Sequence, residues 1–268
     1  MALLEIDDLT LNIVSRTGAR AQILRGVSLR LDEGRTLALI GESGSGKSMT
    51  VKSIMRLLPP RSETGGSIRV GGRSIGELGS RELREYRAKD VAMIYQDPRA
   101  HINPVRRIGD FLTEGMTSTR GMSRADATRR ARQLLDEVGI QDGARRMEQY
   151  PHELSGGLLQ RVMIAAALAC EPRLLLADEP TTALDVTTQS EVMAVLQDLR
   201  EAHGLAMLFI THDLDLALAV SDDAAVMRSG QIVEQLPAGR MRADAAHEYT
   251  RELMAARPAL APRSEEER

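Results

Sequence analysis

The sequence has very few of the cysteine and aromatic residues that hold many small proteins together. Of its 268 residues one is a cysteine, none is a tryptophan, and aromatic residues make up 2%. A single cysteine excludes an internal disulfide framework, and it also excludes a zinc or iron–sulfur site held by several cysteines. This residue, Cys170, ends an apolar run, which predicts a buried and inert thiol.

Long apolar stretches and net positive charge are also missing. The longest apolar run, 162–170, is far shorter than the roughly 20 residues that span a bilayer. The start, MALLEIDDLT, lacks the basic residues and apolar stretch of a signal peptide. The formal net charge is −3, so no basic field favours nucleic acid, and the arginine-rich stretch 123–135 is expected to be a solvated helix face. We therefore expect a cytosolic protein that touches a membrane only through a partner.

Apolar residues make up 43% of the chain, enough for a substantial core, and their pattern alternates between short strands and helices. Strands are expected at 3–13, 27–31, 36–40, 90–96, 173–178 and 206–212, with a hairpin at 67–75 and a strand pair at 224–235. Helices are expected at 47–58, ended by Pro59-Pro60, throughout much of 97–170, and near 187–203. This order predicts a largely parallel sheet with antiparallel strands at the front and an inserted helical block.

A glycine-rich loop, GESGSGKS at 41–48, follows the apolar strand TLALI and opens a helical segment. That context is the one in which such a loop binds phosphates, because its glycines let successive backbone N–H groups face the phosphate oxygens. Lys47 would supply a cation for the β- and γ-phosphates, and Ser48 a hydroxyl for Mg²⁺. The predicted phosphate-binding residues are Gly41, Glu42, Ser43, Gly44, Ser45, Gly46, Lys47 and Ser48.

Two carboxylates follow the apolar strand RLLLA, at Asp178 and Glu179. The strand delivers Asp178 to the edge of the sheet where a phosphate loop would lie, which suits Mg²⁺. Glu179 could then polarise an attacking water as a general base. Gln96 and His212 each end an apolar strand, and polar residues in that position are candidates for the same cleft.

A second potential anion site lies more than a hundred residues from the phosphate loop. In LSGGLLQR, 154–161, two glycines stand directly before a long apolar run. The backbone N–H groups at such a helix start, with the positive end of the helix dipole, favour an anion.

Five motifs in this order, GESGSGKS, YQDP, LSGGLLQR, LLLADEPTTALD and FITHDL, resemble the nucleotide-binding subunits of ATP-binding cassette (ABC) transporters. The resemblance covers nearly the whole chain, and the LSGG motif separates it from other phosphate-loop ATPases. Within the superfamily the chain is most similar to the peptide/nickel importer branch, through QDPRAHINP, SGGLLQRVMIAAAL and HEYTRELM. It implies an α/β fold: a RecA-like phosphate-loop ATPase core with an antiparallel β subdomain and an inserted α-helical subdomain.

The resemblance also implies domain boundaries. Residues 1–256 would form one ABC ATPase domain, with the catalytic core and β subdomain in 1–96 and 171–256 and the helical subdomain in 97–170. Residues 257–268 would be a disordered tail.

In such proteins two subunits pair head to tail, and the SGG loop of one caps the ATP held by the other. The resemblance therefore implies that Ser155, Gly156 and Gly157 bind the γ-phosphate of a partner's ATP, with Asp185 at the dimer seam. Ser48, Gln96 and Asp178 would serve Mg²⁺, Glu179 would activate water, and His212 would contact the γ-phosphate.

The implied partners are a second ABC ATPase subunit, identical or a sister chain, and membrane permease subunits that would hold the protein at the cytoplasmic face of the membrane. An extracytoplasmic solute-binding protein would act indirectly, and no nucleic acid is expected. A coupling helix of the permease would dock on the segment after Gln96 and on the helical block. ATP and Mg²⁺ are the implied cofactors, and peptides, nickel or related small solutes the cargo.

Three departures from the family pattern stand out. No aromatic residue precedes Tyr86, so the usual aromatic stacking on adenine is absent, and Ile13, Val14 or Ile23 would offer only an apolar contact. Position 248 is Glu where the branch's tail usually has Pro. With one cysteine, the chain lacks the cysteine-rich extension that holds an iron–sulfur cluster in many peptide-importing relatives.

Two other classes share the cassette. ABC-type ATPases that work on DNA or the ribosome carry a long coiled-coil insertion or two cassettes, and neither appears here. An accessory subunit of a soluble enzyme complex, such as carbon–phosphorus lyase, stays open as the alternative function.

Overall fold

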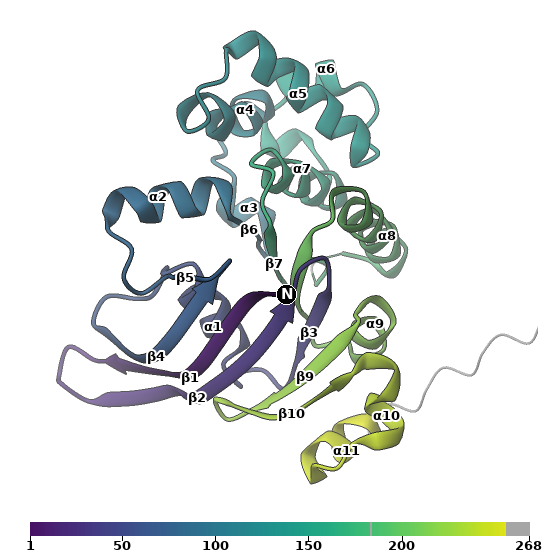
Figure 1. The fold of residues 1–268 in the computed structure, drawn as a ribbon. Helices are drawn as coiled ribbons and strands as arrows, with labels where there is room; N and C mark the ends of the chain where they lie inside the picture. The colour runs from purple at the N-terminus through teal and green to yellow at the C-terminus, as the bar shows by residue number, and fades with distance from the viewer. Residues whose placement is uncertain (183, 256–268) are drawn as a thin grey trace, which may run out of the picture.

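Two β-sheets organise the protein, whose structure, a computed structural model, describes residues 1–182 and 184–255 (Figure 1). The expected disordered tail, 257–268, lies outside the described residues. The smaller sheet is antiparallel, in the order β2-β1-β4-β5, with β1 at Ala2–Val14, β2 at Arg20–Asp32, β4 at Ser62–Val70 and β5 at Arg73–Ser74. The larger sheet has the order β10-β9-β3-β8-β7-β6. Its strands are β3 (Thr36–Ile40), β6 (Val91–Ile94), β7 (Leu174–Asp178), β8 (Ala206–Ile210), β9 (Asp223–Arg228) and β10 (Gln231–Pro237).

The strands from β9 through β6 pair in parallel, and β10 pairs antiparallel with β9. All five residues of β3, of β7 and of β8 are buried, as expected for strands covered on both faces. Because these strands are parallel, their carboxyl ends meet at one edge of the sheet. The predicted parallel sheet with antiparallel strands in front is confirmed.

Helices cover both faces of the larger sheet. Before β6 lie α1 (Lys47–Ile54) and α2 (Ser80–Lys89). Between β6 and β7 come α3 (Pro98–His101), α4 (Ile108–Ser118), α5 (Arg124–Glu137), α6 (Gly143–Glu148), a 3₁₀ turn at Pro151–Glu153, and α7 (Gly156–Leu168). The rest of the chain adds α8 (Val186–His203), α9 (Leu214–Val220), a 3₁₀ turn at Ala238–Arg240, α10 (Met241–Asp244) and α11 (Glu248–Ala255). No helix within 1–182 and 184–255 is long and apolar enough to cross a bilayer.

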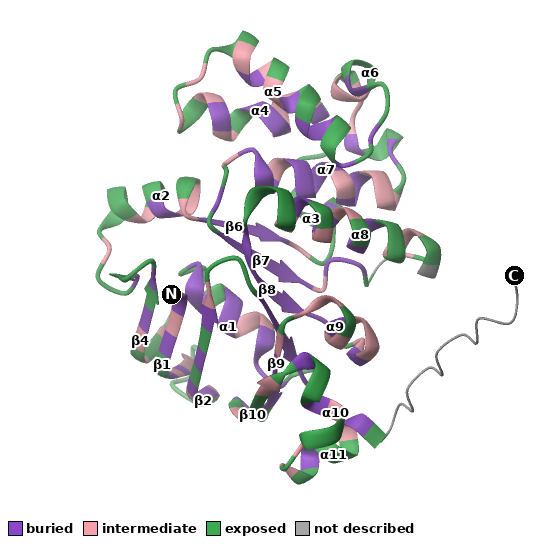
Figure 2. Ribbon diagram, turned by 45° about the vertical axis from the view of Figure 1, so that its right-hand side comes forward, coloured by how far each residue is buried: buried purple, intermediate pink, exposed green. Residues whose placement is uncertain are grey.

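Figure 2 shows that the buried residues concentrate on the strands of the larger sheet and on the helix faces turned toward them. One apolar cluster joins β7 and β8 to α7, α8 and the helical block above them. A second joins the same sheet to α1 and to the antiparallel sheet. In α8 Val192, Leu196 and Leu199 are buried, so one face of this helix packs on the core. The sheet edge at the carboxyl ends of β3, β7 and β8 is thereby fixed between two packed layers.

Several of the expected boundaries are wrong. The first helix ends at Ile54 rather than at Leu58, because Arg56 takes a left-handed conformation (φ 51°) and its N–H and that of Leu57 bond back to Ser53 and Lys52. Strand β2 begins at Arg20, seven residues before the expected 27, since its first half pairs with β1 over Ala21–Ile13 and Gln22–Asn12. Strands β6 and β8 end at Ile94 and Ile210, so the polar residues expected to end them follow in loops. Cys170 is half-buried instead of buried.

Candidate active site

The glycine-rich loop lies between β3 and α1, and close packing requires two of its glycines, Gly41 and Gly46. A Cβ on Gly41 would lie 2.1 Å from the carbonyl oxygen of Met227, and one on Gly46 would lie 2.9 Å from Leu24 Cδ2. Gly46 also has a φ of 114°, which side-chain-bearing residues rarely adopt. No side chain caps the start of α1, so the first N–H groups of this helix are free to bind an anion.

Lys47 turns back onto the loop that carries it. Its Nζ donates hydrogen bonds to the carbonyl oxygens of Gly41 (2.7 Å) and Glu42 (2.9 Å), and the side chain is buried. Burial lowers the pKa of Lys47, while the neighbouring carboxylates Glu179, Asp178 and Glu42 oppose that shift. The ammonium group is thus held against the loop by neutral carbonyl oxygens. An incoming phosphate would offer it charged oxygens in their place.

Asp178 ends β7 as predicted and meets the first turn of α1. Ser48 Oγ donates to Asp178 Oδ1 at 3.0 Å. Burial raises the pKa of Asp178, the hydrogen bond from Ser48 opposes the shift, and nearby Glu179 reinforces it. A hydroxyl and a carboxylate oxygen therefore converge beside the phosphate loop. This pair suits Mg²⁺, which takes hard oxygen ligands and keeps water or phosphate in its remaining positions. Within the described residues no cluster of three or more His, Cys, Asp or Glu side chains could hold a metal ion. Mg²⁺ at this pair would therefore need water or phosphate oxygens as its other ligands.

Glu179 follows directly, and three polar groups surround one of its carboxylate oxygens. Gln96 Nε2 donates to Oε2 at 3.0 Å, Thr182 Oγ1 donates at 2.9 Å, and His212 Nδ1 lies 3.5 Å away. Glu179 adopts a φ of 48°, a left-handed conformation that is uncommon for a glutamate and costs backbone energy. The residue is fixed in this position by its N–H, which donates to Ile210 of β8.

The predicted cleft residues Gln96 and His212 do meet at Glu179, although each lies two residues beyond its strand. Thr182, which donates to the same oxygen, was not predicted from the sequence. The signal was present in EPTT, because a threonine three residues after an acid on a turn can donate to that carboxylate. Sequence alone did not reveal the direction of that side chain.

The second predicted anion site, at the start of α7, is a separate place in the fold. Ser155 caps α7, its Oγ accepting from the Leu158 N–H at 3.3 Å, and it is exposed. No hydrogen bond or ion pair in the described part of the chain joins residues 154–161 to the phosphate loop. The motif instead lies against the start of α8, since a Cβ on Gly157 would lie 2.5 Å from Thr188 Cγ2.

Asp185 caps that neighbouring helix. Its carboxylate accepts from the N–H and the hydroxyl of Thr188, at 3.0 and 2.8 Å, and these bonds lower the pKa of Asp185. Two helix starts with exposed caps, at Ser155 and Asp185, thus lie side by side, and no hydrogen bond within the described residues joins either cap to the phosphate loop.

Of the three residues expected to offer adenine an apolar contact, Ile23 lies next to the phosphate loop. Ile13, Val14 and Ile23 are all half-buried. Ile23 is next to the phosphate loop, because its carbonyl oxygen is 3.5 Å from the position of a Cβ on Gly46. Residues 1–85 contain no aromatic side chain that could replace it.

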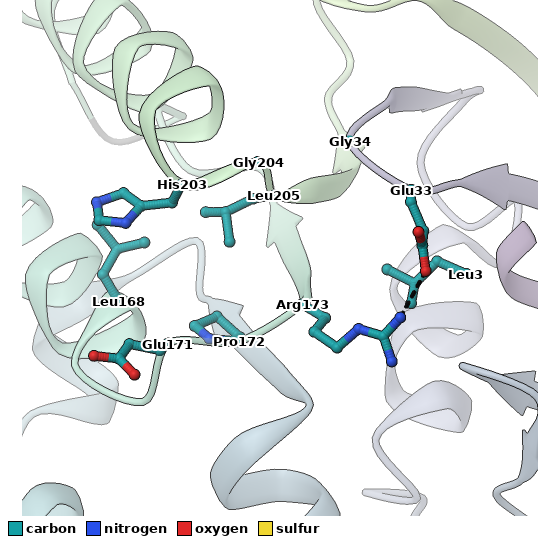
Figure 3. Close-up of a pocket in the computed structure, with 10 residues that line it drawn as sticks. All are labelled: Leu3, Glu33, Gly34, Leu168, Glu171, Pro172, Arg173, His203, Gly204 and Leu205. Atoms are coloured by element: carbon teal, nitrogen blue, oxygen red, sulfur yellow. Dashed lines mark hydrogen bonds and ion pairs between the residues drawn. The ribbon is translucent and has the colours of Figure 1, made fainter. Parts of the chain in front are cut away.

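A cavity at the opposite edge of the sheet has no part in this cluster (Figure 3). It has a volume of about 320 Å³, and its lining includes Arg173 and Leu205, which precede β7 and β8. In Figure 3 Arg173 reaches Glu33, and the two form an ion pair at 2.6 Å. The catalytic candidates lie instead beyond the carboxyl ends of the same strands.

Comparison with known proteins agrees with this geometry. The family model described as ABC transporter matches residues 24–182. The oligopeptide transport ATP-binding protein OppD of Bacillus subtilis is 43% identical over 99% of this chain and 74% of its own length. OppD of Salmonella typhimurium is 42% identical over 96% of this chain and 77% of its own. A solved dimer of the ATP-binding cassette MJ0796, in a post-hydrolysis state with ADP and Pi, is 27% identical, with a TM-score of 0.77 over 88% of this chain and 98% of that one.

The fold therefore has the predicted architecture, a phosphate-loop ATPase core with an antiparallel β subdomain and an inserted helical subdomain. The chain binds ATP and is an ATPase, and it belongs to the ABC transporter family.

Proposed function

We propose that this chain energises an importer for peptides, nickel or related small solutes, as one of two ATPase subunits that close around ATP. The observation that carries this proposal is the separation of the two anion sites. The phosphate loop has a complete set of catalytic candidates beside it, whereas Ser155 is exposed, and among the described residues no hydrogen bond joins it or the glycines after it to that loop. The similarity to a dimeric cassette and to oligopeptide transport proteins supports the same arrangement.

Each site residue then has a role. Residues 41–48 hold the triphosphate, with Lys47 moving from its carbonyl partners to the phosphates. Ser48, Asp178 and Gln96 hold Mg²⁺, which neutralises charge on the phosphate oxygens when it is bound. Glu179 accepts a proton from the attacking water, and His212 contacts the γ-phosphate. Ser155, Gly156, Gly157 and Asp185 act on the ATP of the partner subunit.

The anchoring of Glu179 explains how it could serve as a base. Gln96, Thr182 and His212 all occupy the Oε2 side of the carboxylate. The Oε1 atom is left to receive a proton, in a cluster whose orientation is fixed before ATP arrives. Such preorganisation removes the need to reorient the base during the reaction.

A groove between α2, α4 and α7 is proposed to receive the permease. Its volume is about 320 Å³, and its lining includes Tyr95, Phe111, Met163 and Cys170. Tyr95 stacks on His101 at 3.8 Å between ring centroids, and its N–H donates to Met163 Sδ. Because the next residue is Gln96, a helix seated in this groove would act one residue away from the hydrogen bond to Glu179. The protein would accordingly be peripheral, bound to the cytoplasmic face of the membrane.

The domain division proposed for the chain follows from this arrangement. Residues 1–256 act as one ATPase domain, in which the helical segment 97–170 carries the SGG motif and part of the permease groove. ATP binding in the core would then move both surfaces together.

Purification of the tagged full chain from membranes tests the proposal. We expect an integral membrane permease to accompany it and to restore ATP-driven uptake of a short peptide or nickel in reconstituted vesicles. Phe111→Asp should abolish the association, because it places a charge in the apolar groove. Ser155→Arg should leave the association intact while stopping uptake. Co-purification with a soluble enzyme complex in place of a permease would refute the importer and support the accessory-subunit alternative.

A further inference from the structure

The C-terminal segment packs against the strand that leads into the phosphate loop. Figure 1 shows α10 and α11 beside β9 and β10, at the edge of the larger sheet. Met241, Tyr249 and Met254 are buried in one cluster with Ile40, the residue directly before the loop. The segment therefore contacts the catalytic core although it comes last in the chain.

A set of polar contacts fixes the start of α11. The Glu234 carboxylate on β10 accepts hydrogen bonds from the N–H groups of Ala246 (2.7 Å) and His247 (3.3 Å). Burial alone would raise the pKa of Glu234, but these N–H donors hold it below its ordinary value. His247 Nδ1 in turn accepts from the N–H of Tyr249 at 3.1 Å. This chain of contacts sets the position of Tyr249 from β10.

Tyr249 reaches the phosphate loop directly. Its ring lies under the guanidinium of Arg228, 4.5 Å from the ring centroid, and only 3% of the residue is exposed. The hydroxyl accepts a hydrogen bond from the N–H of Glu42 at 3.3 Å, across 207 positions of sequence. Tyr249, in the C-terminal helix α11, thus bonds to Glu42, the second residue of the phosphate loop.

The peptide group between Gly41 and Glu42 is consequently held from both sides. Its carbonyl oxygen, on Gly41, accepts from Lys47 Nζ, and its N–H, on Glu42, donates to Tyr249. When Lys47 moves to the phosphates, the carbonyl loses its partner. The hydroxyl of Tyr249 is then the remaining side-chain contact on this peptide. Loss of that contact would let the peptide rotate and misalign the N–H groups that follow it.

We propose that Tyr249 is a positioning residue for ATP binding, which acts by orienting the Gly41–Glu42 peptide so that the phosphate loop is preformed. The inference rests on the proposed role of residues 41–48 in holding phosphates. It assigns the C-terminal segment that carries α10 and α11 a function in the ATPase cycle of its own chain.

Tyr249→Phe tests this most directly, because it removes the hydroxyl and keeps the ring. We expect the KM for ATP to rise about three- to tenfold, the range expected for one hydrogen bond, with kcat within twofold of the parent. Amide hydrogen exchange should rise in the peptide covering 41–48. Tyr86→Phe is the matched control, since its hydroxyl donates to Ile54 O at the far end of α1 (3.1 Å). That variant should lower thermal stability without changing KM.

Glu234→Gln provides a second test that leaves Tyr249 itself unchanged, and it should raise KM in the same direction by loosening α11. An unchanged KM in both variants would overturn the proposal. A raised KM with unchanged exchange at 41–48, or an equal rise in Tyr86→Phe, would also overturn it, by showing a general structural effect. If residues 41–48 do not hold phosphates, the variant Lys47→Ala should bind ATP normally. That result would be distinct from failure of the proposal for Tyr249.

Discussion

Replacement of Glu179 by glutamine should separate chemistry from binding. The substitution keeps the length and shape of the side chain but removes its ability to accept a proton. At present Oε2 accepts hydrogen bonds from Gln96 and Thr182. In Glu179→Gln the amide oxygen can occupy that position and keep both bonds, which directs the NH₂ group toward the site of the attacking water. The fold and the phosphate loop should therefore be unaffected.

The expected loss in turnover is ~10²–10⁴-fold, the usual contribution of a general base. This corresponds to about 2.7–5.4 kcal/mol of transition-state stabilisation, at about 1.36 kcal/mol for each factor of ten. ATP binding should stay within about threefold of the parent, since a change at the base leaves the phosphate contacts of Lys47 and the loop in place. Phosphate release under single-turnover conditions measures the first quantity, and nucleotide titration measures the second.

Glu33→Gln is the matched control. It makes the same chemical change to a carboxylate that pairs with Arg173 in the cavity at the opposite edge of the sheet (Figure 3). Turnover by this variant should equal that of the parent. If Glu179→Gln hydrolyses ATP at more than a tenth of the parent rate, Glu179 is not the base and the assignment of the cluster is wrong.

Two further results are expected. Side-by-side titration should find that ATP and GTP bind within about tenfold of each other, because a half-buried Ile23 offers the base an apolar contact worth little in discrimination; a preference above a hundredfold would mean that another group reads the base. Asp178→Asn should lower turnover by at least about tenfold, yet raise the thermal stability of the nucleotide-free protein at pH 7. Burial raises the pKa of Asp178 despite the Ser48 hydrogen bond, so the folded state binds this proton more tightly than the unfolded state does. The wild type therefore regains stability as pH falls through that pKa, and the advantage of the variant should shrink; an advantage that grows with falling pH would contradict the reasoning.

The parts of the site that depend on a local motif were accessible from the sequence. The loop 41–48 joins a buried strand to a helix, and Asp178 ends a buried strand, so their chain neighbours already determine where they lie. Gln96 and His212 were placed correctly because parallel strands bring their carboxyl ends together, although both strands stop two residues earlier than expected.

The parts that depend on the direction of a side chain or on distant partners were not accessible. Thr182 donates to Glu179 only because the turn after β7 directs it back toward the strand. Tyr249 meets Glu42 through packing of α11 on the core, across 207 residues that no local pattern connects. The first half of β2 is a strand because β1 pairs with it, while its own sequence, RAQILR, carries a weak alternation. The early end of α1 depends on a left-handed arginine, a conformation that sequence rarely announces.

The central claim is that each ATP is held between two chains, and mixing two inactive variants tests it most directly. Ser155→Arg should fill the gap meant for a partner's γ-phosphate, while Lys47→Ala should disable the phosphate loop of its own chain. In a mixed homodimer both lesions can fall in one composite site and leave the other intact, so ATPase activity should return to a substantial fraction of the parent's activity per intact site. If two different chains form the natural pair, one lesion is placed in each. Absence of any recovery, or loss of ATP binding by the isolated Ser155→Arg monomer, would contradict the shared site.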